Sequence, residues 1–196
     1  MTFEYEDRQS RSRFVDVIWR THDTSDGTYL AAADACWDMI FIRSVHGNRV
    51  LLSGPSSQTT PVPYRAGNRN VGIRFHRGTF LTHVPASVMV DTTDALSMPT
   101  DDTFILAGLD WSMPTFETAD EFIADLERLQ LLSDDPVAMA ALRGEEAATV
   151  DGLTSRWGHG RLLRPGLMAR WRHPVPRHQH RAAESAGLSA SGGECP

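Results

Sequence analysis

The stretch WDMIFIRSVHGNRVLLSG, residues 37–54, decides the fold class, because it reads as two apolar strands joined by a tight turn. The turn His46-Gly47-Asn48 supplies residues that tolerate a positive φ angle. A hairpin of this kind is typical of antiparallel sheets. Further short apolar runs lie on both sides of it at roughly ten-residue spacing. The pattern therefore predicts a small antiparallel barrel or sandwich.

The runs on either side of the hairpin also predict strands. FVDVIWR over 14–20 alternates apolar and polar residues, which predicts a strand with Val15, Val17 and Trp19 on its buried face. TTPVPYRAG over 59–67 contains two prolines. Because proline has no N–H to donate to a central ladder, we expect this segment to be an edge strand or a crossing.

The segment NVGIRFHRGTFLTH over 70–83 raises the question of chemistry, because it combines a strand pattern with two histidines. Arg74 and His76 fall on the polar face of the strand. A barrel metal site needs about three converging ligands, with a typical H-x-H pair. His76 and His83 are instead separated by a turn. We predict no metal site.

Other catalytic patterns are equally weak. Cys36 lies in an apolar run, where a cysteine behaves as a small hydrophobic residue. The sequence has no G-x-S-x-G motif for a serine nucleophile, and it contains no lysine for a Schiff base. We predict no catalytic residue and no cofactor, so the chain is not expected to be an enzyme.

Two helices are predicted after the strands. Thr118 and Glu121 have the spacing of a capping box, and apolar residues then recur at helical spacing over 119–132. Pro136 begins a second helix that runs to Arg143. The apolar stripe of the first helix, which we consider for dimerisation, consists of Phe122, Ile123, Leu126 and Leu129.

The net charge of −6 conceals two different parts. Residues 1–151 carry 12 arginines against 23 acidic residues, so this part is repelled by nucleic acid. Residues 152–196 carry 7 arginines and two acidic residues, with several prolines and no periodicity. We expect a disordered basic tail. Its arginines and interleaved tryptophans also fit a nucleic-acid-binding arm.

The sequence gives several indications of location. No apolar run is long enough to cross a membrane, and the charged N-terminus does not read as a signal peptide. Cys36 and Cys195 lie far apart, which does not suggest a disulfide framework. We therefore expect a cytoplasmic protein.

Residues 32–96 resemble the N-terminal sensor domain of AraC-type transcriptional regulators, in the divergent branch of high-GC bacteria. Four elements in order carry this resemblance: Asp34-x-x-Trp37-Asp38-Met39-Ile40, then Ser53-Gly54-Pro55, then Gly72-Ile73-Arg74-Phe75 with Gly78-Thr79-Phe80-Leu81, and finally Val84-Pro85-Ala86-Ser87. DPVAMAALRG over 135–144 is similar to the linker helix that precedes the DNA-binding half of these regulators.

The resemblance implies an α+β fold in which a small cupin-like β-barrel is followed by a helical pair. It implies the following division: an N-terminal extension over 1–12, a barrel sensor domain over 13–116, a helical dimerisation and linker segment over 117–150, and the tail over 151–196. The family binds a small-molecule effector, forms homodimers and binds DNA through two helix-turn-helix motifs. No helix-turn-helix pattern follows residue 151, so we interpret the chain as a truncated or frame-disrupted regulator.

On this interpretation, Trp37, Asp38, Arg74 and His76 are the residues expected to face an effector pocket or a partner. Two alternatives stay open. The chain could be a small cupin-like metal-binding enzyme, which would carry a removable transition metal. It could also be a stand-alone interaction module whose 119–132 helix pairs with a partner.

Overall fold

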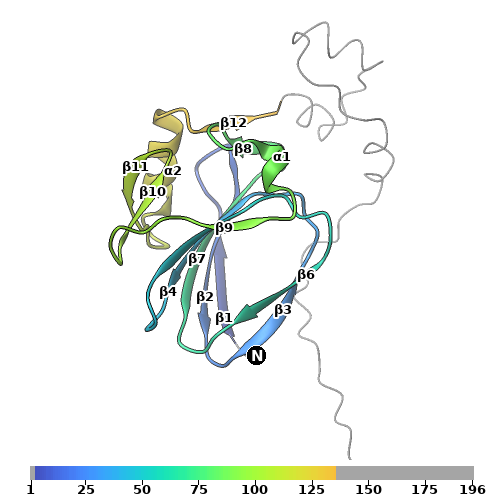
Figure 1. The fold of residues 1–196 in the computed structure, drawn as a ribbon, viewed down its shortest axis with the longest axis vertical. Coiled ribbons are helices and arrows are strands. Elements are labelled where there is room, and N and C mark those ends of the chain that lie inside the picture. Colours follow the sequence, from blue (N-terminus) through green and yellow to red (C-terminus); the bar gives the residue numbers. More distant parts are fainter. Residues whose placement is uncertain (1–2, 136–196) are drawn as a thin grey trace, which may run out of the picture. The chain divides into compact units, whose positions relative to one another are not determined.

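A computed structural model describes residues 3–135, which form a mostly antiparallel β structure (Figure 1). Its main element is a six-stranded sheet in the order β1-β2-β7-β4-β5-β9, with every neighbouring pair antiparallel. The strands of this sheet are β1 Phe3–Arg8, β2 Val15–Asp23, β4 Asp38–Arg43, β5 Arg49–Ser53, β7 Arg69–Phe75 and β9 Thr93–Ala95. The expected extension over 1–12 therefore contains an edge strand.

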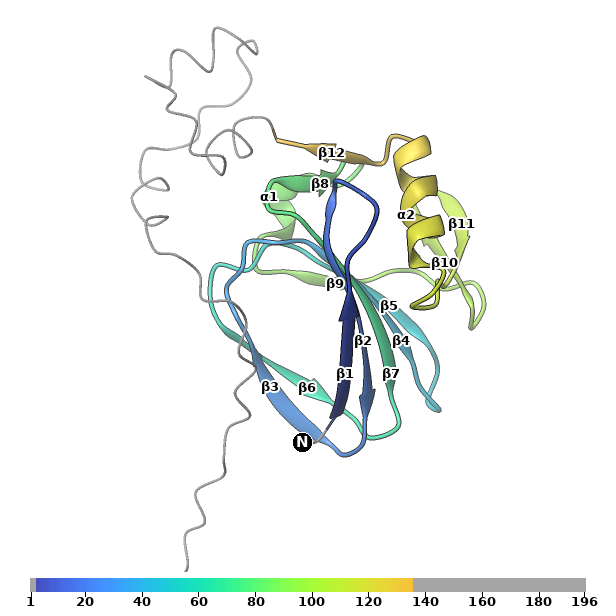
Figure 2. The ribbon, with the colours of Figure 1, turned by 180° about the vertical axis from the view of Figure 1, so that it is seen from behind.

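Three two-stranded ribbons and two helices complete the described part. The ribbons are β3 Gly27–Ala31 with β6 Thr60–Tyr64, β8 Thr79–Leu81 with β12 Leu132–Asp134, and β10 Thr103–Leu106 with β11 Leu109–Ser112. The helices are the single-turn α1 Ala86–Met89 and the longer α2 Ala119–Arg128. Seen from behind, α2 and the β10–β11 hairpin lie together at one end of the molecule, away from the β3–β6 ribbon (Figure 2).

One face of the six-stranded sheet, the core face, packs against α2 and the β10–β11 hairpin. Phe41 of β4 contacts the rings of Phe104 and Phe122 at centroid distances of 5.6 and 5.7 Å. Met39 and Ile73, which are cross-strand neighbours, are fully buried on the same face. Burial of such side chains is the main favourable term in folding. The core therefore lies between the sheet and the helix.

The hairpin predicted from the opening stretch is confirmed. Strands β4 and β5 pair around a turn in which Gly47 has φ +107°, a conformation that favours glycine. The segment with two prolines is also confirmed as an edge strand, because β6 pairs with β3 alone.

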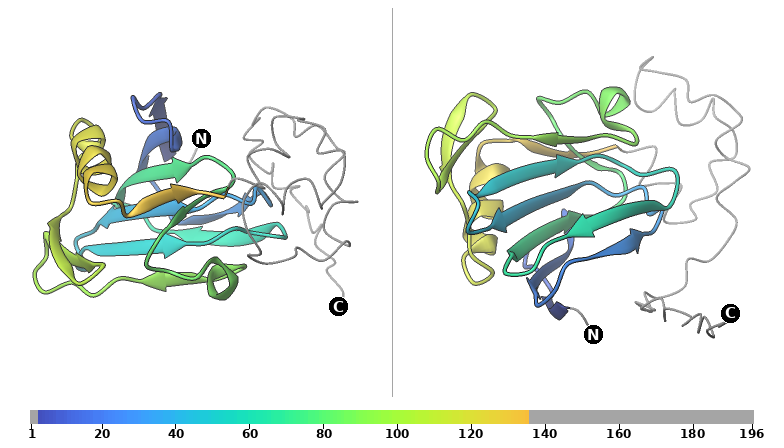
Figure 3. Two further views of the ribbon diagram at one scale, coloured as in Figure 1. Left: turned by 90° about the horizontal axis from the view of Figure 1, so that it is seen from above. Right: turned by 60° about the horizontal axis from the view of Figure 1, so that its bottom comes forward.

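The predicted cupin-like barrel followed by a helical pair is wrong. Within residues 3–135 the sheets do not close on one another, and the edges of the main sheet are β1 and the short β9 (Figure 3). Pro61 and Pro63 offer one physical reason, since they remove two backbone donors from β6, which a closing strand would need. Of the helical pair, α2 is present and the second helix, expected over 136–143, lies outside the described residues.

The helix begins at Ala119 as predicted, but it ends earlier than expected and lacks the predicted capping bond. Thr118 makes no side-chain capping bond, because its hydroxyl accepts the N–H of Thr115 at 2.9 Å, so the capping box is wrong. At the other end, the N–H of Gln130 donates to the Glu127 carbonyl and the N–H of Leu131 donates to the Leu126 carbonyl. This is a Schellman motif, and it ends the helix before β12.

The alternation predicted for β2 is interrupted. A register shift between Val15 and Val17 marks a β-bulge. Val15 therefore points to the core face with Ile18, whereas Val17 and Trp19 point to the opposite face beside Arg74. One extra residue thus moves Trp19 out of the core to which periodicity assigned it.

A search of the described helices for membrane-spanning candidates found none with the necessary length and apolar character.

The end of α2 gives a stability prediction. Gln130 occupies the left-handed position of the Schellman motif at φ +56°, which costs a non-glycine residue about 1–2 kcal/mol. Q130G should raise the free energy of unfolding by about 0.5–1 kcal/mol, after the entropic cost of glycine is subtracted. Urea denaturation measures this. Q58G, at an exposed site with no positive φ, is the control and should give no gain.

Candidate functional site on the Arg74 face

The second face of the six-stranded sheet, opposite the core face, is the candidate site. We call it the Arg74 face. Strict alternation along β7 points Gly72 and Arg74 to this side, while Ile73 and Phe75 enter the core. Asp38 of β4 stands directly opposite Arg74 across the two strands. The face is thus defined by cross-strand register.

A buried ion network lies at the centre of this face. The guanidinium of Arg74 donates to Asp38 twice, from Nε to Oδ1 and from Nη2 to Oδ2, at 2.9 Å each. The same Nη2 lies 3.0 Å from Oδ2 of Asp34. The side chain of Arg74 is only 20% exposed, that of Asp38 is 12% exposed and that of Asp34 is 11% exposed. Bidentate pairing of this kind is the geometry that favours arginine over lysine.

The loop before β4 holds Asp34 in place. Ala35 adopts a left-handed conformation at φ 55°, which turns the chain sharply after Asp34. The N–H of Cys36 donates to Oδ1 of Asp34 at 3.1 Å, and Nε of Arg77 donates to the Asp34 carbonyl at 2.9 Å. Asp34 is therefore fixed from both its side chain and its backbone.

Burial and charge act against each other in this network. Burial raises the pKa of Asp38, and the adjacent Arg74 cation opposes that rise. For Arg74, burial alone would lower the pKa, but the charges of Asp38 and Asp34 raise it overall. The guanidinium is charged at every physiological pH. The network therefore keeps a permanent cation among carboxylates.

Aromatic rings lie on the Arg74 face and on the β3–β6 ribbon. The indole of Trp19 lies directly over Gly72, where a Cβ atom would overlap it, so only glycine fits beneath the ring. On the β3–β6 ribbon, the rings of Tyr29 and Tyr64 are 6.4 Å apart, and Phe3 meets Tyr64 edge-on at 5.6 Å. These rings give the Arg74 face and the neighbouring ribbon broad apolar surfaces suited to stacking.

The pKa values of two tyrosines reflect the negative charges near this face. Burial and the neighbouring Asp7 raise the pKa of Tyr5 to about 12. Burial raises the pKa of Tyr29 as well, and the negative charge of Asp38 adds to the effect. Both shifts mean that ionisation of the phenol is disfavoured beside these carboxylates. The neighbouring carboxylates therefore make the Arg74 face more acidic than basic, despite its central arginine.

This arrangement suits non-covalent recognition. Among the described residues, Nη1 of Arg74 has no hydrogen-bond acceptor, so it can donate to a bound molecule. Asp34 and Asp38 offer carboxylate oxygens, and Trp19 and Tyr29 offer ring faces. Polar groups placed among aromatic side chains can fix the orientation of a bound small molecule.

Of the four residues predicted for a pocket, the structure brings two together. Asp38 and Arg74 are partners in the ion network. Trp37 is 3% exposed and belongs to the core, because it precedes Asp38 and points the other way. His76 follows the end of β7 and is exposed, with Nδ1 3.7 Å from Oδ1 of Asp16.

Sequence reasoning missed Asp34, Trp19 and Tyr29 as members of the site. The sequence did point to Asp34, because this residue begins the first element of the family resemblance. For Trp19 the alternating pattern was misleading, because the bulge in β2 turns the side chain to the other face of the sheet. Nothing in the sequence pointed to Tyr29, since its position depends on the β3–β6 ribbon lying near the network.

The four residues considered for dimerisation have different positions. Phe122, Ile123 and Leu126 are buried in this chain's own core, where they hold α2 against the sheet. Their side chains are therefore not free for a partner. Leu129 remains 39% exposed at the end of the helix.

Comparisons with known proteins found no matching family model, no matching curated protein and no matching solved structure. Within residues 3–135, no three histidine, cysteine, aspartate or glutamate side chains gather as they would around a metal ion. The functional conclusion therefore depends on the geometry of the Arg74 face and on the sequence resemblance.

The environment of Cys36 gives a second prediction. Burial and the charge of Asp34 raise the pKa of this thiol to about 12, against 9.0 for a free thiol, so at about pH 8 it has roughly a thousandth of the usual thiolate. In a C195S variant, whose single thiol is Cys36, labelling by iodoacetamide should be slower by at least that factor in native than in denatured protein. Equal rates in the two states would show that Cys36 is open and ionised.

Proposed function

We propose that residues 3–135 form the effector-sensing part of an AraC-type transcriptional regulator, with the effector bound on the Arg74 face. One observation carries the proposal. Two of the four elements behind the family resemblance, far apart in sequence, supply the partners of one buried ion network: Asp34 and Asp38 come from the first element and Arg74 from the third.

A network of this kind costs desolvation free energy, because three charged side chains are taken out of water on a sheet face. Replacing a buried ion pair by apolar residues of similar size is often neutral or stabilising, so stability alone does not account for its presence. We attribute its presence to recognition, since Nη1 of Arg74 has no acceptor among the described residues. The effector that fits is a small, uncharged or cationic polar ring, because the surrounding carboxylates repel an anion.

The remaining features of a regulator belong to the same proposal. The chain acts without catalysis, in the cytoplasm, and as a homodimer. A dimer contact has to use residues other than Phe122, Ile123 and Leu126, because these fill the core. DNA binding is not included, since the sequence shows no helix-turn-helix pattern.

Ligand titration tests this function. The isotope-labelled full chain is screened by NMR against a library of sugars, nucleosides and aromatic heterocycles, with the amide of Gly72 as the reporter beneath Trp19. A ligand of the predicted class should shift this signal saturably. In the Y29A variant its affinity should fall about tenfold through loss of ring contact.

The matched control is L30A, because Leu30 is the next residue of β3 and is 69% exposed. It should bind like the wild type. Library members that bind without shifting Gly72, or that bind Y29A and the wild type equally, would contradict an effector site on the Arg74 face.

A further inference from the structure

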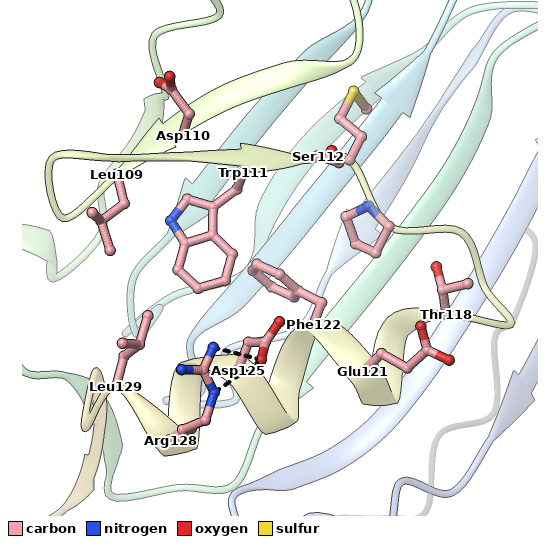
Figure 4. Close-up of a pocket in the computed structure, with 12 residues that line it drawn as sticks. Leu109, Asp110, Trp111, Ser112, Thr118, Glu121, Phe122, Asp125, Arg128 and Leu129 are labelled. Carbon is pink, nitrogen blue, oxygen red and sulfur yellow. Dashed lines mark hydrogen bonds and ion pairs between the residues drawn. The ribbon is translucent and has the colours of Figure 1, made fainter.

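A groove lies between β11 and α2, at a place that the proposed sensing function does not use. It has a volume of about 590 Å³ and is open to solvent along one side (Figure 4). Its walls are formed by the β11 strand and the segment after it, and by one side of α2, with Leu109, Asp110, Trp111, Glu121, Phe122 and Leu129 among the lining residues.

The floor of the groove is apolar, and contacts within the chain hold its central side chain, Trp111, in position. The Trp111 ring meets Phe122 edge-on at a centroid distance of 5.2 Å, and its Nε1 donates to the Leu106 carbonyl at 3.1 Å. These two contacts fix the indole. Leu109 and Leu129 flank it and are 46% and 39% exposed. Large apolar side chains left open around a fixed tryptophan are characteristic of protein-binding sites.

The rim of the groove is acidic. Asp110, Glu121 and Asp125 are all exposed, and Arg128 is the only cationic residue in the lining. Arg128 is already neutralised, because its Nη2 and Nε donate to Oδ1 of Asp125 at 2.9 and 3.3 Å. Within residues 3–135, neither Asp110 nor Glu121 has an ion-pair partner. The groove therefore presents two uncompensated negative charges beside an apolar floor.

We propose that this groove docks a basic peptide segment of another protein, which inserts one large apolar side chain between Leu109 and Leu129 onto Trp111. Arginine or lysine residues next to that anchor pair with Asp110 and Glu121. Charge complementarity selects this occupant. The acidic part of a second copy is disfavoured, since residues 1–151 carry 23 acidic residues against 12 arginines. Residues 152–196, with 7 arginines against two acidic residues, have the charge of a competing occupant, and their docking between two copies would give a dimer.

The apolar floor and the acidic rim of the groove contribute differently to the affinity for the peptide. The anchor side chain supplies most of the affinity, because it removes apolar surface from water at a fixed aromatic floor. The rim charges are exposed, so they add modest affinity and strong salt dependence. The complex should therefore weaken with added salt without disappearing.

Fluorescence anisotropy of a labelled peptide, Arg-Arg-Phe-Arg-Arg, tests the proposal with the full chain. The peptide should bind, while Glu-Glu-Phe-Glu-Glu and Arg-Arg-Ala-Arg-Arg should not. The double variant L109A/L129A should lose about tenfold or more in affinity through lost apolar contact. The double variant D110N/E121Q should lose about fivefold and most of the salt dependence.

Two matched controls separate docking from general effects. L30A removes an exposed leucine from β3, and D94N removes an exposed acid from β9; both should bind as the wild type does. Equal affinity for L109A/L129A and L30A would overturn the proposal, as would failure of Arg-Arg-Phe-Arg-Arg to bind. Sedimentation showing a dimer that L109A/L129A dissociates would also overturn it, by making a second copy the occupant.

Discussion

The guanidinium of Arg74, held between Asp38 and Asp34, is the constraint on which the rest of the described structure depends. A buried charge is tolerated only when it is paired and hydrogen-bonded, so β4 and β7 have to keep the register that sets Asp38 opposite Arg74. A slip of one residue would turn Arg74 into the core and Ile73 out of it. The ion network and the hydrophobic core thus require the same strand pairing.

This register gives the sheet two faces with different chemistry. The core face packs against α2 through Phe41 and Phe122 and supplies the apolar burial that stabilises the domain. The Arg74 face carries charged and aromatic side chains, among them Trp19 over Gly72. The groove beside α2 is a third surface, whose floor is an extension of the core through the contact of Trp111 with Phe122.

Local features were predictable from the sequence, and features set by tertiary contacts were not. The hairpin around Gly47 and the proline-limited edge strand follow from backbone chemistry within a few residues. The face of Trp19 depends on a bulge, which leaves no mark in an alternating pattern. Closure of a barrel depends on pairing between distant strands, for which the family resemblance gave the wrong expectation. In the site, Asp38 and Arg74 were predicted individually, but their partnership was visible only in the structure.

A double-mutant cycle between Arg74 and Asp38 tests the central claim most directly. The free energies of unfolding of R74M, D38N and the double variant are compared with the wild type by urea denaturation. The account predicts a coupling energy of about 2–3 kcal/mol, as for a buried pair in one network. The cycle of the exposed pair, H76A with D16N, should give about 0.5 kcal/mol or less. Equal small couplings in both cycles would contradict the account, because Arg74 would then be an ordinary surface arginine.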